Sequence, residues 1–244
     1  MKRFLKITNL PLIVLGSGLL TCFMRFLLLQ KKDAQGLLPV GNFTDVMSLI
    51  LVAITLGLLF WGCRQLKGGN KYAYNFSASL SAAAGMALAA FGFLITSIAE
   101  LGAATDSIGK FSALLGFFAA IALGLLAYVR FKGQRLNVIF HGLVCFYLIL
   151  HLVSHYRLWS SCPQLQSYGF ELLAIVFVML ATYQRAAFDA GSGNRQAYTF
   201  FSLTALYFCI AALPGCDNAA FFLGSAAWMF CTPCKLSNPA KKEN

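Results

Sequence analysis

The chain has 244 residues, of which 59% are hydrophobic and only 11% are charged, and its mean hydropathy is +0.73. Soluble domains carry about 25% charged residues, so this composition excludes a soluble globular protein and indicates an integral membrane protein. The net charge of +11 does not indicate a nucleic-acid-binding protein, because the basic residues are scattered through short turns and form no single basic cluster.

Eight segments of the chain are predicted to be membrane helices. A run of about 20 apolar residues, at about 1.5 Å rise per residue, crosses a hydrocarbon core of about 30 Å. Within lipid the backbone polar groups must be paired inside the segment, which favours helices. The predicted helices cover residues 10–30, 43–62, 76–99, 111–131, 136–156, 170–188, 197–213 and 218–234. The predicted fold class is therefore an all-α polytopic membrane protein with eight transmembrane helices.

The start of the chain leaves one alternative open. Residues 19–22, Leu-Leu-Thr-Cys, are close to a lipoprotein cleavage sequence, in which case the first helix is a signal segment. Thr21 before Cys22 fits such a sequence poorly, and the apolar run continues beyond Cys22. An uncleaved first helix is the favoured interpretation.

The positive charges predict an orientation in the membrane. Turns on the side of the N-terminus carry fourteen of the nineteen lysines and arginines, the opposite turns carry four, and Arg25 lies within a helix. Lysine and arginine are enriched in cytoplasmic loops. Both termini are therefore predicted to be cytoplasmic, and the general look of the chain is that of a bacterial plasma-membrane protein.

A short motif occurs twice and predicts an internal repeat. Residues 69–76 (Gly-Asn-Lys-Tyr-Ala-Tyr-Asn-Phe) and 193–200 (Gly-Asn-Arg-Gln-Ala-Tyr-Thr-Phe) are identical at five of eight positions, and each precedes a long apolar run. At an offset of 126 residues, three further pairs correspond: Gly16 with Gly142, Arg25 with His151, and Asp45 with Glu171.

The repeat divides the chain into two tandem four-helix halves, residues 1–132 and 133–235, followed by a polar cytoplasmic tail at 236–244. An even number of helices per half gives the halves parallel orientation, one of the arrangements that transporters use. The third helix is rich in alanine and serine, which predicts close packing against its neighbours.

The repeated charged positions are the main candidates for a binding site. Arg25 lies within the first helix, and Asp45 lies near the start of the second. Charged side chains at membrane depth are costly and are often functional, so Arg25 with Asp45, and His151 with Glu171, are predicted to pair and to line an outward-facing polar site between the halves. The simpler alternative is that Arg25 reaches the headgroups and Asp45 favours a helix N-terminus.

All three histidines lie in the fifth predicted helix, and His151 and His155 share one face of it. Two histidines at this spacing bind a metal only with further ligands, and the sequence identifies none. No metal site and no cofactor are therefore expected.

Two weaker site predictions concern the cytoplasmic side. Asn70 and Asn194 are suitable N-caps, with Lys71 and Arg195 beside them, so a paired anion site is one interpretation and plain helix capping is the favoured one. Cys231 and Cys234 have the C-x-x-C spacing of thiol–disulfide centres but lack the usual βαβ context.

The remaining cysteines give one further prediction. Cys162 and Cys216 fall on the predicted external side, where a disulfide forms if their loops are adjacent.

These observations predict a small transporter or permease-like carrier for a small molecule or ion. The alternative is a non-catalytic membrane partner or sensor subunit of a larger complex, and a membrane thiol-redox protein is a third hypothesis. Enzymatic functions are disfavoured because the loops are too short to hold a catalytic domain. The lipid bilayer and a membrane protein partner are the expected associations, and nucleic acid is not.

Overall fold

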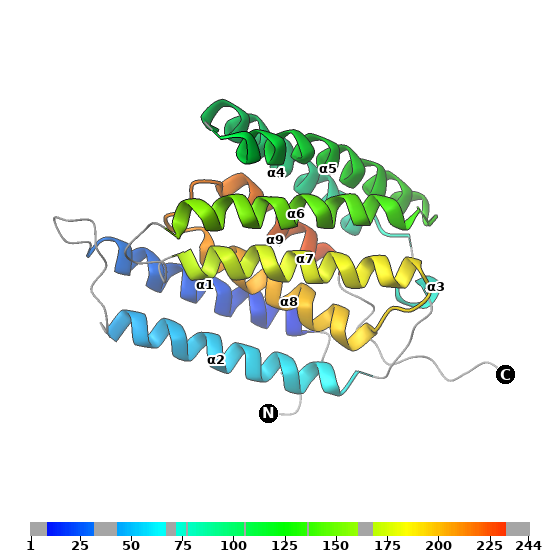
Figure 1. Cartoon of the computed structure of the whole chain (residues 1–244). Helices are drawn as coiled ribbons and strands as arrows, with labels where there is room; N and C mark the ends of the chain where they lie inside the picture. The colour runs from blue at the N-terminus through cyan, green and yellow to red at the C-terminus, as the bar shows by residue number, and fades with distance from the viewer. Residues whose placement is uncertain are drawn as a thin grey trace.

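The computed structural model describes residues 9–31, 43–66, 72–76, 78–104, 106–135, 137–160 and 168–232, and all regular secondary structure within these ranges is helical (Figure 1). Eight helices have 13 residues or more, and α3 is a single turn. Their bounds are α1 Leu10–Leu29, α2 Phe43–Arg64, α3 Tyr72–Asn75, α4 Leu80–Ala103, α5 Ser107–Lys132, α6 Val138–Trp159, α7 Gly169–Asp189, α8 Arg195–Ala212 and α9 Ala219–Cys231.

Six of these helices, α1, α2 and α4 to α7, are long and apolar enough to cross a membrane. The prediction of an all-helical, multi-pass membrane protein is therefore confirmed. Helices α8 and α9 have 18 and 13 residues and are not among the six. Eight crossings, the tandem halves and the orientation of the termini stay predictions.

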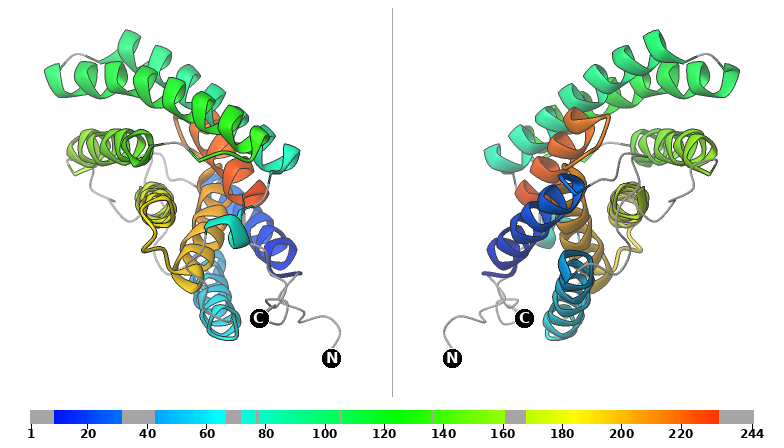
Figure 2. Two further views of the ribbon diagram at one scale, coloured as in Figure 1. Left: turned by 90° about the vertical axis from the view of Figure 1, so that its right-hand side faces the viewer. Right: turned by 90° about the vertical axis from the view of Figure 1, so that its left-hand side faces the viewer.

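Helix α8 occupies the middle of the bundle, as the nearly end-on views of Figure 2 show. It contacts α1, α2, α7 and α9, and 14 of its 18 residues are buried, whereas α1 buries 7 of 20. Because protein rather than lipid surrounds α8, its polar side chains are tolerated. The hydroxyls of Thr199 and Ser202, for example, bond backbone carbonyls of α8 itself.

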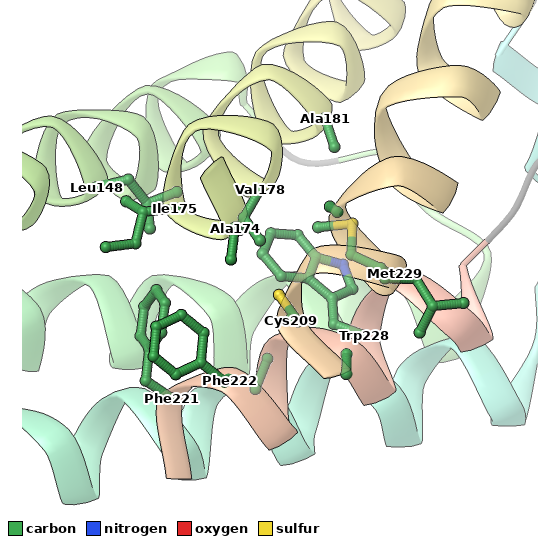
Figure 3. Close-up of a cluster of buried hydrophobic side chains, with 14 of the residues drawn as sticks. Leu148, Ala174, Ile175, Val178, Ala181, Cys209, Phe221, Phe222, Trp228 and Met229 are labelled. Atoms are coloured by element: carbon green, nitrogen blue, oxygen red, sulfur yellow. The ribbon is translucent and has the colours of Figure 1, made fainter. Parts of the chain in front are cut away.

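The other helices are arranged around this centre in two groups. The α4–α5 pair lies at one edge of the bundle and packs through α4 on α9, while α2 lies at the opposite edge against α1 and α8 (Figure 1). Helices α6 and α7 connect the two groups, because α6 packs on α5 and α7 packs on α8. Figure 3 shows the apolar core between them, where Cys209 lies among Trp228 and Met229 of α9 and Ala174 and Val178 of α7.

The small residues of α4 allow its backbone to approach α9 closely. A Cβ added to Gly92 would overlap the carbonyl oxygen of Ala220, and one added to Gly85 would come within 2.6 Å of the Cβ of Cys231. Gly224 of α9 is equally confined by the backbone of α4. Close packing of the third predicted helix is thus confirmed. Its partner α9, however, belongs to the other predicted half.

The predicted start of the third helix at residue 76 is wrong. The chain forms the single turn α3 and then begins α4 at Leu80, where the hydroxyl of Ser79 accepts a hydrogen bond from the backbone N–H of Ala82 at 3.3 Å. Serine at an N-cap satisfies an otherwise unpaired donor, which fixes the helix start there. Residues 72–76 are thereby free to pack at the end of the bundle.

Candidate functional site

A polar pocket lies at one end of the bundle, where α4, α6 and α8 end and α7 and α9 begin; we call it the Glu100 end. The pocket is lined by one face of α6, the start of α7, the turn between α8 and α9, and α9 itself. The lining residues are His151, His155, Trp159, Glu171, Ile175, Asp217, Asn218 and Phe222. Five of these eight side chains are ionisable or carry an amide, which is unusual for a space between membrane helices.

Helix α6 supplies the wall of the pocket through a row of rings. Tyr147, His151, His155 and Trp159 are spaced four residues apart, so they lie one above another on a single helix face. Successive ring centres are 5.4, 4.3 and 4.9 Å apart. The contact of Trp159 with Tyr168 and that of His151 with Phe221 fix this row against α7 and α9.

The carboxylate of Glu100, in the last turn of α4, is the group on which the site converges. Its Oε1 atom lies 2.9 Å from Nε2 of His155 and 3.4 Å from Nδ1 of His151. The amide of Asn218 donates a hydrogen bond of 2.9 Å to the same oxygen. The Nδ1 atom of His151 is buried and, within the described ranges, has no partner with hydrogen-bond geometry. Two helices, α4 and α6, and the turn before α9 thus bring four polar side chains together.

These groups have the composition of a metal-binding site. One ligand atom each from Glu100, His151 and His155 all lie within 4.8 Å of one another. Two ligand atoms at about 2.0–2.2 Å from a tetrahedral Zn²⁺ are about 3.3–3.6 Å apart. The oxygen of Glu100 lies at comparable distances from the two imidazole nitrogens, 2.9 Å for His155 and 3.4 Å for His151. Asn218 takes the position of a group that orients a ligating carboxylate. The residues therefore fit a divalent cation after small movements of the side chains.

Arg25 lies next to this site but faces other partners than predicted. The residues of α1 that face α8 include Gly18, Thr21 and Arg25. The guanidinium of Arg25 donates a hydrogen bond of 2.6 Å to the carbonyl of Ala211, and its carbon lies 4.5 Å from the centre of the Phe170 ring. The ion pairs among the described residues do not include Arg25 with Asp45, and this pairing stays a prediction.

The ion pairs of the described residues likewise do not include His151 with Glu171, although both residues line the pocket. His151 faces Glu100 instead, whose carboxylate also contacts His155 on the same face of α6. Glu171 is 4% exposed and interacts electrostatically with Arg25 and Asp217. Of the four predicted site residues, the structure therefore gathers His151, Glu171 and Arg25 in one region and leaves Asp45 at the start of α2.

Sequence reasoning missed Glu100 and Asn218 and gave His155 no partner. A usable signal was present, since Glu100 is an acidic residue inside a long apolar helix, and such residues mark functional sites by default. The prediction followed only charges that the repeat duplicates. Glu100 has no acidic counterpart at the repeat offset, so the repeat does not indicate it.

The predicted residues on the opposite side are partly described. Asn194 caps α8, because its side-chain oxygen accepts hydrogen bonds from the backbone N–H groups of Gln196 and Ala197. Arg195 is 1% exposed, and it is buried within the bundle rather than displayed as a surface anchor. Asn70 and Lys71 lie outside the described residues.

The cysteine predictions concern residues that are only partly described. Cys231 is free and half-buried on α9, and Cys234 lies outside the described residues. Cys216 is free in the turn after α8, and Cys162 lies outside the described residues. Burial, together with the nearby Glu171 carboxylate, raises the pKa of the Cys216 thiol to about 11. This thiol is therefore protonated, and poorly reactive, at neutral pH.

The fold and the pocket define a class: an all-helical, multi-pass membrane protein with a histidine- and carboxylate-lined pocket at one end of its bundle. No protein-family model, no curated protein and no solved structure matches this chain.

Proposed function

We propose that the chain is a small membrane carrier whose cargo is a divalent transition-metal cation, bound by Glu100, His151 and His155. The observation that supports this proposal is the convergence of one carboxylate oxygen and two imidazole nitrogens within 4.8 Å. Imidazole and carboxylate together suit Zn²⁺ and similar first-row ions better than Mg²⁺ or Ca²⁺, which prefer oxygen ligands alone.

The residues around the ligands give each step of binding a physical basis. Asp217 is exposed at the pocket, so its charge attracts a cation from solution. Neutral imidazoles and an ionised carboxylate are the forms that bind metal, so binding displaces any protons they hold, and acid weakens it. In the absence of the cation, the contact of His155 with Glu100 keeps the two ligand atoms together.

The position of the ligands supports a carrier rather than a structural metal site. Glu100 comes from α4, while His151 and His155 come from α6, and these belong to different predicted halves of the chain. In alternating-access transporters the substrate site lies between two repeats, and one repeat moves against the other. A small separation of α4 from α6 would split the ligand set and release the cation.

Equilibrium binding of Zn²⁺ to the purified protein tests the site. Loss of residues that merely orient a ligand costs about 10–100-fold in metal affinity, so Glu100→Gln and His155→Ala are each expected to cost more than about 100-fold. Asn218→Ala is expected to cost about 10–100-fold, because its amide contacts the ligands Glu100 and His155 and is not itself counted among the ligands.

His141→Ala is the matched control, since it removes the histidine of the same helix that faces Asp189 at the other end. Unchanged Zn²⁺ affinity in Glu100→Gln, or an equal loss in His141→Ala, would refute the site. Zn²⁺ uptake into vesicles containing the protein then tests transport. Tight binding without uptake would support the alternative function, a sensor or partner subunit.

A further inference from the structure

Two buried arginines meet at the end of the bundle opposite the polar pocket, which we call the Arg185 end. Arg130 of α5 is 6% exposed and Arg185 of α7 is 7% exposed. Both pack on the ring of Phe76, with guanidinium carbons 5.2 Å and 3.6 Å from its centre. Two like charges are thus brought together within the bundle, where they repel each other.

The hydrogen bonds of these arginines are incomplete. The Nη2 atom of Arg185 donates to the hydroxyl of Tyr72 at 2.9 Å, and Tyr72 in turn donates to the carbonyl of Gln134 at 3.3 Å. The Nη1 atom of each arginine is buried and has no hydrogen-bond partner among the described residues. A guanidinium stays charged in proteins, so it cannot relieve this cost by losing a proton.

The surrounding groups do not neutralise the two charges. Among the described residues, Asp189 supplies a carboxylate in electrostatic range, and three arginines, Arg130, Arg135 and Arg185, act on it. Its Oδ2 atom lies 3.2 Å from Nδ1 of His141, but within the described ranges it forms no ion pair with any arginine. Contacts with aromatic faces offset only part of the cost of a buried unpaired charge.

We propose that Arg130 and Arg185 bind a phosphate group. A phosphate supplies up to two negative charges and several acceptor oxygens, so it satisfies both unpaired Nη1 donors at once and offsets their repulsion. Tyr72 and Phe76 orient the two planar groups by packing against them. The site is separate from the cation pocket, because it lies at the opposite end of the same helices.

The phosphate has two sources with the same chemistry, a phospholipid headgroup and a free phosphate in solution. Each is tested on the full-length protein. In one arm, thermal unfolding in an uncharged detergent is followed while sodium phosphate replaces sodium chloride at constant ionic strength. In the other arm, unfolding is compared in phosphatidylcholine vesicles with and without phosphatidic acid.

The expected result is a melting temperature that rises with phosphate, with phosphatidic acid, or with both, and the arm that responds identifies the source. Charge-assisted hydrogen bonds contribute about 1.5–3 kcal/mol each, so Arg130→Gln and Arg185→Gln are each expected to weaken binding by about 10–100-fold. Arg185→Lys keeps the charge but loses the planar fork. Its melting temperature is expected to rise less with phosphate than that of the native protein, and this variant tests the site if the glutamine variants do not fold.

Arg64→Gln is the matched control. Arg64 also packs on a ring, 4.6 Å from the centre of Phe60, but it is exposed. It is near the same end of the bundle, since Leu66, two residues beyond the end of α2, accepts a hydrogen bond through its carbonyl from the side chain of Gln196 of α8. Its phosphate response is expected to equal that of the native protein. The proposal is overturned if the native protein responds in neither arm, or if Arg185→Gln responds as strongly as the native protein.

Discussion

Arg25 and Glu171 illustrate how single charged residues are accommodated inside this bundle. Arg25 is 7% exposed and Glu171 is 4% exposed, and each is in the electrostatic field of the other. Arg25 also holds α1 to α8 through the carbonyl of Ala211. Replacing either residue alone leaves the other buried charge less well compensated.

We expect Arg25→Met and Glu171→Gln to be coupled. Each single variant should lower the free energy of unfolding, and the double variant should lose less than the sum, with a coupling of about 0.5–3 kcal/mol. Unfolding by sodium dodecyl sulfate titration in mixed micelles measures these energies.

The same measurement distinguishes this pairing from the predicted one. Arg25→Met combined with Asp45→Asn is expected to be additive within about 0.5 kcal/mol, because the described contacts of Arg25 are on α7 and α8. If Arg25 is coupled to Asp45 and is not coupled to Glu171, the placement of Arg25 beside Glu171 is contradicted.

For single residues, the sequence identifies which ionisable side chains are buried at a cost in free energy, but it does not identify the groups that they contact. The burial of Arg25, His151 and Glu171 follows from their positions in apolar runs. Their partners depend on how α1, α4 and α6 are rotated and placed around α8, and helical periodicity in one segment contains no information about the neighbouring helix.

Among the helices, the α4–α9 contact depends most on the absence of side chains. Gly92 lies against the carbonyl of Ala220, and Gly224 lies against the backbone at Leu88 and Ala89. In a membrane, where hydrophobic association between helices is absent, such close approach supplies the packing energy. It also holds the last turn of α4, and hence Glu100, next to Asn218 at the start of α9.

Gly92→Ala is therefore expected to destabilise the protein by about 1–3 kcal/mol, as overpacking does in other tightly packed contacts. Gly102→Ala on the same helix is the control, because a Cβ there meets nothing within 4 Å. It should leave stability unchanged or raise it by up to about 1 kcal/mol through helix propensity. Thermal unfolding in detergent compares the two, and equal stability would argue against the close approach.

Element boundaries show where local sequence signals succeed. Asn194 accepts a hydrogen bond from the backbone N–H of Gln196 in the first turn of α8, as its side chain predicts, and Asn137 caps α6 in the same way through Ile139. The start of α4 was misplaced because Phe76 looks like the first residue of an apolar run, whereas its ring packs on Tyr198 and Phe188 at the Arg185 end. Only the tertiary contact makes Phe76 part of a separate turn.

At the scale of the whole molecule, the composition is sufficient to establish a multi-pass helical membrane protein, and it does not reveal the central position of α8. Polar residues lower the hydropathy of α8, so it resembles a weak membrane segment in the sequence. Its neighbours α1, α2, α7 and α9 explain this composition. The described part of the first motif copy, residues 72–76, meets the second copy at the Arg185 end, where Tyr198 packs on Phe76.

The predicted orientation can be measured with introduced cysteines. Lys110 and Ser192 are exposed at the Glu100 and Arg185 ends, respectively. The bias of positive charge predicts that the Arg185 end is cytoplasmic. In a variant without native cysteines, Lys110→Cys should react with a membrane-impermeant maleimide in intact cells, and Ser192→Cys should react only after the cells are opened.

The cysteine-free protein itself is the control for background labelling. Labelling of Ser192→Cys alone in intact cells would show that the orientation is inverted.

The central position of α8 also has a consequence for biosynthesis. Ribosomes produce α1 and α2 well before α8, the helix against which both pack, because α8 follows α7 in the chain. Until α8 is made, α1 and α2 can pack on each other but lack the helix that both contact in the finished bundle. A nascent chain that stops after α7 lacks the helix on which α1, α2 and α7 all pack, so the synthesis of α8 determines when the bundle can assemble.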